Sequence, residues 1–219
     1  YKVYVLDQID ETIAATTVFT DAVRDGDVAA AQEAYAPSRQ GWERIEPVAE
    51  SFGDLDPKID GRAEVEAEGM EFTGFHRLER DLWETGLQPD SAAMADRLLA
   101  DVTELVTRAK AVELNPLQLA NGSKALLDEI ATGKITGEEE RYSHTDLWDF
   151  EANVEGSTAA IAALRPYLAT ADPALVATID ERGKALSDLL ETYREGDGFV
   201  LYTDLTPQDV KKLTTALDA

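Results

Sequence analysis

The chain has 219 residues, of which 44% are hydrophobic and 29% charged, a balance typical of a globular protein with a sizeable core. Its 44 acidic and 20 basic side chains give a net charge of −24, which argues against binding to nucleic acids or to anionic lipids. Cysteine is absent, which excludes disulfides, thiolate metal sites and cysteine nucleophiles. No apolar run approaches the roughly 18–20 residues that span a bilayer.

Apolar residues at helical spacing predict a first helix from Tyr1 to about Arg24. Gly26 is expected to end it, and Asp27 to cap the next helix. This second helix is predicted over residues 29–52, with Pro37 breaking or kinking it.

Three acidic residues of the second helix, Glu43, Glu46 and Glu50, are spaced to share one face. Stacked like charges repel each other by a few tenths of a kcal/mol per pair unless a cation lies between them. Arg39, four residues before Glu43, could be that cation, and so could a metal ion.

Residues 53–61 are rich in Asp, Pro and Gly and are expected to form a loop. Within it, Asp60 is equally well explained as the cap of a short helix over residues 62–67 and as a metal ligand.

A further helix is predicted over residues 72–83, with His76 and Glu79 on the same side. Helical positions three apart have Cβ atoms about 5–6 Å from each other, so the imidazole and the carboxylate can hold one cation between them. The pair is unspecific by itself, and a packed histidine is the alternative.

The remaining chain also shows helical patterns, which end near Gly86 and Pro89 and resume after Ser91 as a predicted N-cap. The segment Phe199–Tyr202 lacks a partner strand and is expected to be an extended connector. The predicted later helices begin near Ala92, at Asn115-Pro116, at Gly137 (running to about Tyr167), at Asp172-Pro173 and at Thr206-Pro207.

About eight helices and no credible sheet predict an all-α fold, an antiparallel helical bundle. We expect a single domain over residues 1–219, for which two stacked four-helix lobes, 1–113 and 114–219, are one arrangement.

Hydrolysis by a zinc peptidase needs two histidines one helical turn apart and a glutamate general base beside the first. Here Arg77 follows His76 in place of that glutamate, and no histidine lies four residues further on. Ser143 and His144 are sequence neighbours that would point in different directions on a helix, which argues against a Ser–His nucleophile.

One imidazole with several carboxylates suits iron or manganese and can also take zinc or copper. A metallopeptidase-like hydrolase and a structural helical domain without metal remain the alternative functions.

Several segments together resemble the imelysin-like family, in particular the EfeO/EfeM type of extracytoplasmic component in Efe iron-uptake systems. The His-x-x-Glu motif alone is unspecific, whereas the ensemble covers nearly the whole chain in order. The matching segments are Arg39, Trp42–Asp60, Gly74–Glu79, Gly137–Glu139, Arg141–Phe150, and Asp197-Gly198 ahead of Tyr202.

The resemblance implies a non-catalytic helical bundle that binds ferrous or ferric iron and hands it to a membrane iron permease. It also implies a peroxidase-type partner and a location in the bacterial periplasm or cell envelope. A start at Tyr1 rather than Met points weakly in the same direction, since exported chains are processed. Nothing here resembles the cupredoxin-like domain of full-length EfeO proteins, so we expect the shorter EfeM form or a trimmed chain. Carried over by position, the metal ligands are Glu43, Glu46, Asp60, His76, Glu79 and Glu139.

Overall fold

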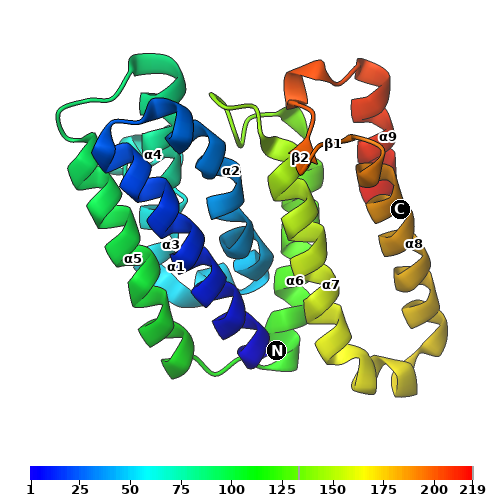
Figure 1. Ribbon diagram of the computed structural model, residues 1–219. Coiled ribbons are helices and arrows are strands. Elements are labelled where there is room, and N and C mark those ends of the chain that lie inside the picture. The colour runs from blue at the N-terminus through cyan, green and yellow to red at the C-terminus, as the bar shows by residue number, and fades with distance from the viewer. Residues whose placement is uncertain (133, 219) are drawn as a thin grey trace. The chain divides into compact units, whose positions relative to one another are not determined.

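A computed structural model describes residues 1–132 and 134–218 of the chain. Over these residues it contains nine α-helices and one two-stranded sheet, so the all-α prediction is confirmed (Figure 1). The chain forms two compact units. The N-terminal unit comprises Lys2–Ile45 and Ala49–Glu113, and the C-terminal unit comprises Tyr1, Glu46–Val48 and the chain from Leu114 onward. None of the helices in the described ranges combines the length and apolar character needed to cross a bilayer.

The N-terminal unit is built on three long helices, with α1 packed against both α2 and α5, and two shorter helices contact α5 (Figure 1). Its core is aromatic: the ring of Phe19 lies 5.5 Å from that of Tyr35 and 6.2 Å from that of Phe75, and all three residues are fully buried. The helices are α1 (Lys2–Asp25), α2 (Val28–Ile45), α3 (Asp56–Ile59), α4 (Gly74–Arg80) and α5 (Ser91–Ala111). Segments of 3-10 helix cover Glu46–Leu55 and Ala63–Glu68, and a π-helical turn covers Asp81–Thr85.

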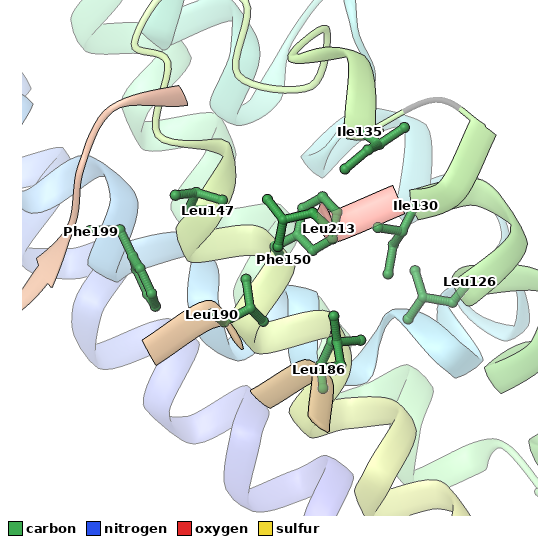
Figure 2. Close-up of a cluster of buried hydrophobic side chains, with 10 residues drawn as sticks. Leu126, Ile130, Ile135, Leu147, Phe150, Leu186, Leu190, Phe199 and Leu213 are labelled. Atoms are coloured by element: carbon green, nitrogen blue, oxygen red, sulfur yellow. The ribbon is translucent and has the colours of Figure 1, made fainter. Parts of the chain in front are cut away.

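In the C-terminal unit, α7 packs between α6 and α8, and α9 packs against α8 and α6 (Figure 1). These helices are α6 (Pro116–Thr132), α7 (Asp146–Ala171), α8 (Pro173–Glu191) and α9 (Pro207–Leu217). A hairpin of β1 (Arg194–Glu195) and β2 (Gly198–Phe199) precedes α9, and 3-10 turns cover Lys134–Thr136 and Tyr202–Asp204. Figure 2 shows the apolar core, to which these helices contribute Leu126, Ile130, Leu147, Phe150, Leu186, Leu190 and Leu213.

Three of the helix starts predicted from capping chemistry, those at Asp27, Asp172 and Thr206, are confirmed. Gly26 has a φ of 72°, and the Asp27 carboxylate accepts a hydrogen bond from the Ala30 amide. Asp172 accepts one from the Leu175 amide, and Thr206 forms a capping box at the start of α9. These bonds satisfy amide groups that the first turn of a helix leaves without partners.

The second helix is shorter than predicted. It runs through Pro37 but ends at Ile45, and a 3-10 segment replaces it up to Leu55. Pro47 explains the ending, because proline has no amide hydrogen and clashes with the preceding helical turn. Glu43 and Glu46 therefore do not share one helix face, as the sequence pattern suggested.

The predicted loop over residues 53–61 instead contains the short helix α3. Asp60 follows α3 and donates its backbone amide to Asp56, while Arg62 occupies the N-cap position of the 3-10 turn that comes next. Asp60 is thus the C-cap of α3 and not the N-cap of the turn that follows. The His76 helix, predicted over residues 72–83, is α4 and covers only Gly74–Arg80 before a π-helical turn.

The long helix predicted from Gly137 begins only at Asp146. In the preceding turns the Glu140 amide donates to the Asp146 carboxylate at 3.2 Å, and His144 has a φ of 61°. Side-chain acceptors of this kind compete with helical hydrogen bonds.

Two smaller predictions are also wrong. Ser91 is the first residue of α5 rather than its cap. The predicted connector Phe199–Tyr202 begins inside the β1–β2 hairpin, where Phe199 pairs with Arg194.

Helix α6 approaches the chain at Pro47 so closely that no side chain fits between them. A Cβ atom on Gly122 would lie 1.8 Å from the Pro47 carbonyl oxygen. This contact holds the segment that carries Glu46 against α6 within the C-terminal unit.

We expect Gly122→Ala to destabilise the protein by about 1–3 kcal/mol, because two backbones must separate to admit the methyl group. Gly183→Ala in α8 is the matched control. No atom lies within 4 Å of its added Cβ, so this change should stabilise the helix by about 0.5–1 kcal/mol. Urea unfolding followed by circular dichroism measures both effects, and a shift of the same sign in the two variants would contradict the packing argument.

Candidate metal centre

Five polar side chains of the N-terminal unit form one buried group, here called the His76 cluster. Arg39 and Glu43 come from α2, Asp60 follows α3, and His76 and Glu79 come from α4. Asp60 is the most exposed of them, with a side chain only 9% accessible to solvent. Charges so far from water are stable only when paired or bound to an ion.

Local backbone geometry brings the members of the cluster together. Arg39 and Glu43 are four residues apart on α2 and therefore neighbours on its surface. Gly74 starts α4 with a φ of +82°, and a Cβ atom there would lie 2.2 Å from the carbonyl oxygen of Ile59. Because glycine permits this close approach, the first turn of α4, with His76, lies beside the end of α3, where Asp60 follows.

The cluster is a continuous chain of polar contacts. Arg39 contacts Glu43 Oε1 through Nη2 and Asp60 Oδ1 through Nη1, each at 2.5 Å. His76 Nε2 lies 3.5 Å from the same Asp60 oxygen, and His76 Nδ1 lies 3.2 Å from Glu79 Oε2. Both nitrogens of the imidazole thus face a carboxylate.

This geometry suits a cation. Ligands that sit about 2.0–2.2 Å from a first-row metal ion at right angles to each other are about 3 Å apart. The nitrogen–oxygen separations at His76 are 3.5 Å at Nε2 and 3.2 Å at Nδ1, and because these nitrogens face in different directions, one ion fits either pair but not both. Alternatively, Nδ1–H donates to Glu79, which fixes the tautomer and directs the Nε2 lone pair toward Asp60, an arrangement common among metal-binding histidines.

A second buried network supports the end of α4. Arg77 forms an ion pair with Asp81 and lies 3.2 Å from Asp90, and Ser91 Oγ donates to Asp81 at 2.6 Å. These contacts tie the turn after α4 to the first residue of α5. They restrict the rotation of α4 about its axis and so hold His76 facing Asp60.

The C-terminal unit has a buried group of its own, here called the Lys134 cluster. Lys134 Nζ lies 2.9 Å from both carboxylate oxygens of Glu46 and 3.6 Å from Glu139 Oε1. Asn153 donates to Glu46 at 2.7 Å. The Lys134 side chain is only 2% exposed, so its ammonium group depends on these oxygens in place of water.

The loop that carries Glu139 is fixed by Tyr202. The Tyr202 amide donates to the His144 carbonyl at 2.8 Å, the phenol donates to the Ile135 carbonyl, and the ring covers Gly137. Burial, and secondarily the negative charge of Asp146, raise the pKa of Tyr202 to about 12. Within the acidic run, Glu138 is exposed whereas Glu139 and Glu140 are buried.

Within the N-terminal unit the structure brings Glu43, Asp60, His76 and Glu79 into one cluster, and within the C-terminal unit Glu46 and Glu139 both lie against Lys134. That all six are metal ligands stays a prediction. Sequence reasoning missed Lys134 and Asn153. Neither belongs to a recognisable motif, and Lys134 could have been suspected only as a lone basic residue just ahead of an acidic run.

The fold and the His76 cluster define an all-helical protein with a carboxylate-rich site around one imidazole. The chain belongs to the imelysin family: the family model for imelysin, also named peptidase family M75, matches residues 1–219. The resemblance predicted from the sequence is thus confirmed.

Individual relatives agree with this assignment. The chain is 44% identical over 222 residues to the iron uptake system component EfeO of Escherichia coli O157:H7. It is 43% identical to the proteins of the same name from Escherichia coli K12 and Shigella flexneri. Each alignment covers 100% of this chain but 59% of the relative, so the chain spans little more than half the length of these proteins.

We expect Lys134→Met to destabilise the protein by about 3–5 kcal/mol, because it leaves the Glu46 carboxylate buried without its counter-charge. Lys124→Met in α6 is the control, since the Lys124–Asp128 pair is 76% and 64% exposed and should contribute less than about 1 kcal/mol. Chemical denaturation measures both variants. Equal effects would show that the Lys134 pair is no more important than a surface ion pair.

The raised pKa of Tyr202 predicts a loss of stability at high pH. An unfolded tyrosine ionises near pH 10, whereas Tyr202 in the folded protein stays neutral up to about pH 12, so rising pH favours the unfolded state over this interval. Tyr202→Phe should therefore be less stable than wild type by about 1 kcal/mol at pH 8, through the lost hydrogen bond, and the difference should shrink between about pH 10 and 12. Tyr167→Phe, at a ring that is 67% exposed, should show no such change.

Proposed function

We propose that this protein binds iron as cargo in the His76 cluster and delivers it for uptake across a membrane, without catalysing a reaction. The carrying observation is that the imidazole of His76 has a buried carboxylate beside each of its nitrogens, Asp60 at 3.5 Å and Glu79 at 3.2 Å, within a cluster drawn from three separate segments. The iron-uptake names of relatives over 40% identical to this chain support iron as the cargo.

The donor atoms support the choice of metal. Carboxylate oxygens with a single imidazole nitrogen form a hard ligand set, which suits ferrous or ferric iron and manganese and can also accept zinc or copper. Three carboxylates against one guanidinium leave the cluster negative, so a bound cation replaces repulsion between carboxylates with attraction.

The same cluster supports a non-catalytic role. A zinc peptidase of the familiar helical type places two histidines and a glutamate base on one metal. This sequence has only two histidines; His76 belongs to the N-terminal unit and His144 to the C-terminal unit. We therefore propose binding and release of the ion in place of hydrolysis, although the family model carries a peptidase name.

The partners follow from a carrier role. A carrier needs a recipient for its ion, and the relatives are named as components of an iron uptake system. We propose a membrane iron permease as the recipient, a peroxidase-type component as a further partner, and the periplasm or cell envelope as the location.

Calorimetric titration with Fe²⁺ under anaerobic conditions tests the proposal. Glu43→Gln and His76→Gln should each weaken binding by tenfold or more, because each removes a ligand while keeping a similar side-chain volume. Glu33→Gln on the same helix, at an exposed position, and His144→Asn, which tolerates the positive φ, are the matched controls and should bind like wild type. Wild-type affinity in both cluster variants would leave only a structural role for the cluster.

A further inference from the structure

Arg39 lies at the centre of the His76 cluster. Its guanidinium contacts Glu43 on one side and Asp60 on the other, each at 2.5 Å, and lies 5.4 Å from the centre of the Phe75 ring. The side chain has no exposure to solvent. Arg39 therefore cannot turn outward to water when a second cation enters the cluster.

The charge of Arg39 is permanent. A guanidinium does not lose its proton in proteins, so it carries one positive charge whatever the cargo or the pH. Without it, the cluster would hold three buried carboxylates and one imidazole. With it, Glu43 and Asp60 are paired with a positive charge, and the cluster can stay folded when no metal ion is bound.

The position of Arg39 also bears on which metal ions the cluster can bind. Asp60 Oδ1 faces Arg39 Nη1 at 2.5 Å and His76 Nε2 at 3.5 Å. A metal ion bound between Asp60 and His76 would therefore lie only a few ångströms from the fixed positive charge of Arg39. The repulsion between them grows in proportion to the charge on the ion.

We propose that Arg39 is a specificity-determining residue of the metal site, whose fixed charge holds Glu43 and Asp60 in place before binding and disfavours trivalent relative to divalent ions. The inference rests on the proposed function, because it concerns the selectivity of that same site. It distinguishes Arg39 from a purely structural arginine, which would alter the affinities for all ions alike.

Affinities of the full chain for Mn²⁺ and Tb³⁺, measured by calorimetry, test this selectivity. In Arg39→Gln the ratio of Tb³⁺ affinity to Mn²⁺ affinity should rise by about tenfold or more, since one unit of charge at this distance acts more strongly on the trivalent ion. Arg39→Lys keeps the charge and should keep the wild-type ratio. Arg24→Gln removes an arginine that is ion-paired with Asp21 and Asp96, outside the cluster, and should also leave the ratio unchanged.

A second pair of variants keeps the test decisive if Arg39→Gln does not fold. Glu43→Gln removes one carboxylate, and the double variant Arg39→Gln/Glu43→Gln restores the net charge of the wild-type cluster. Passing from the single to the double variant should again raise the ratio about tenfold. The double variant should have nearly the wild-type ratio.

The outcomes separate the two proposals. If wild type binds both ions and the ratio does not change on removal of Arg39 in either background, the specificity role is wrong while the metal site stands. If wild type binds neither of these ions nor Fe²⁺, the proposed function itself is wrong and the inference is withdrawn with it.

Discussion

The requirement that buried charges be paired governs both units of this protein. Arg39 lies between Glu43 and Asp60 in one, and Lys134 lies between Glu46 and Glu139 in the other. A lone ion transferred from water into a protein interior is destabilised by several kcal/mol even after the surroundings relax. In both clusters, buried carboxylates of this acidic chain are accompanied by a basic side chain. In the N-terminal unit, the ion pairs of Arg39 connect α2 with the end of α3.

The two clusters use different basic residues for a physical reason. The planar guanidinium of Arg39 can contact two carboxylates in different directions, from α2 and from the end of α3, while its face lies over Phe75. The ammonium of Lys134 is a compact charge that contacts both oxygens of one carboxylate, while Asn153 supplies a further donor to Glu46. In the first arrangement His76 faces a carboxylate on each side. In the second, one ammonium group lies against two carboxylates.

Much of the fold could be predicted from local chemistry. The caps at Asp27, Asp172 and Thr206, the stop at Gly26 and the helical spacing of apolar residues each depend on neighbours within one or two turns. The predictions failed where a local signal was overridden. Pro47 ended a helix whose apolar pattern continued, and the Asp146 carboxylate held the Glu140 amide in a turn where the pattern favoured a helix. The family could also be recognised from the sequence, because its motifs recur in order along the chain.

The sequence by itself determined the helical class, the acidic character and the pairing of His76 with Glu79, since spacing along one helix fixes which side chains face the same way. Tertiary structure decided which carboxylates join that pair. Asp60 reaches His76 because Gly74 lets α4 start against Ile59, and Glu46 lies outside the helix that carries Glu43 because α2 ends at Ile45. Contacts between residues distant in sequence depend on how whole helices pack, and packing depends on side-chain shapes that no local pattern records. The role of Arg39 is of this kind: its pairing with Glu43 could be read from a four-residue spacing, but its second contact, with Asp60, exists only in the folded unit.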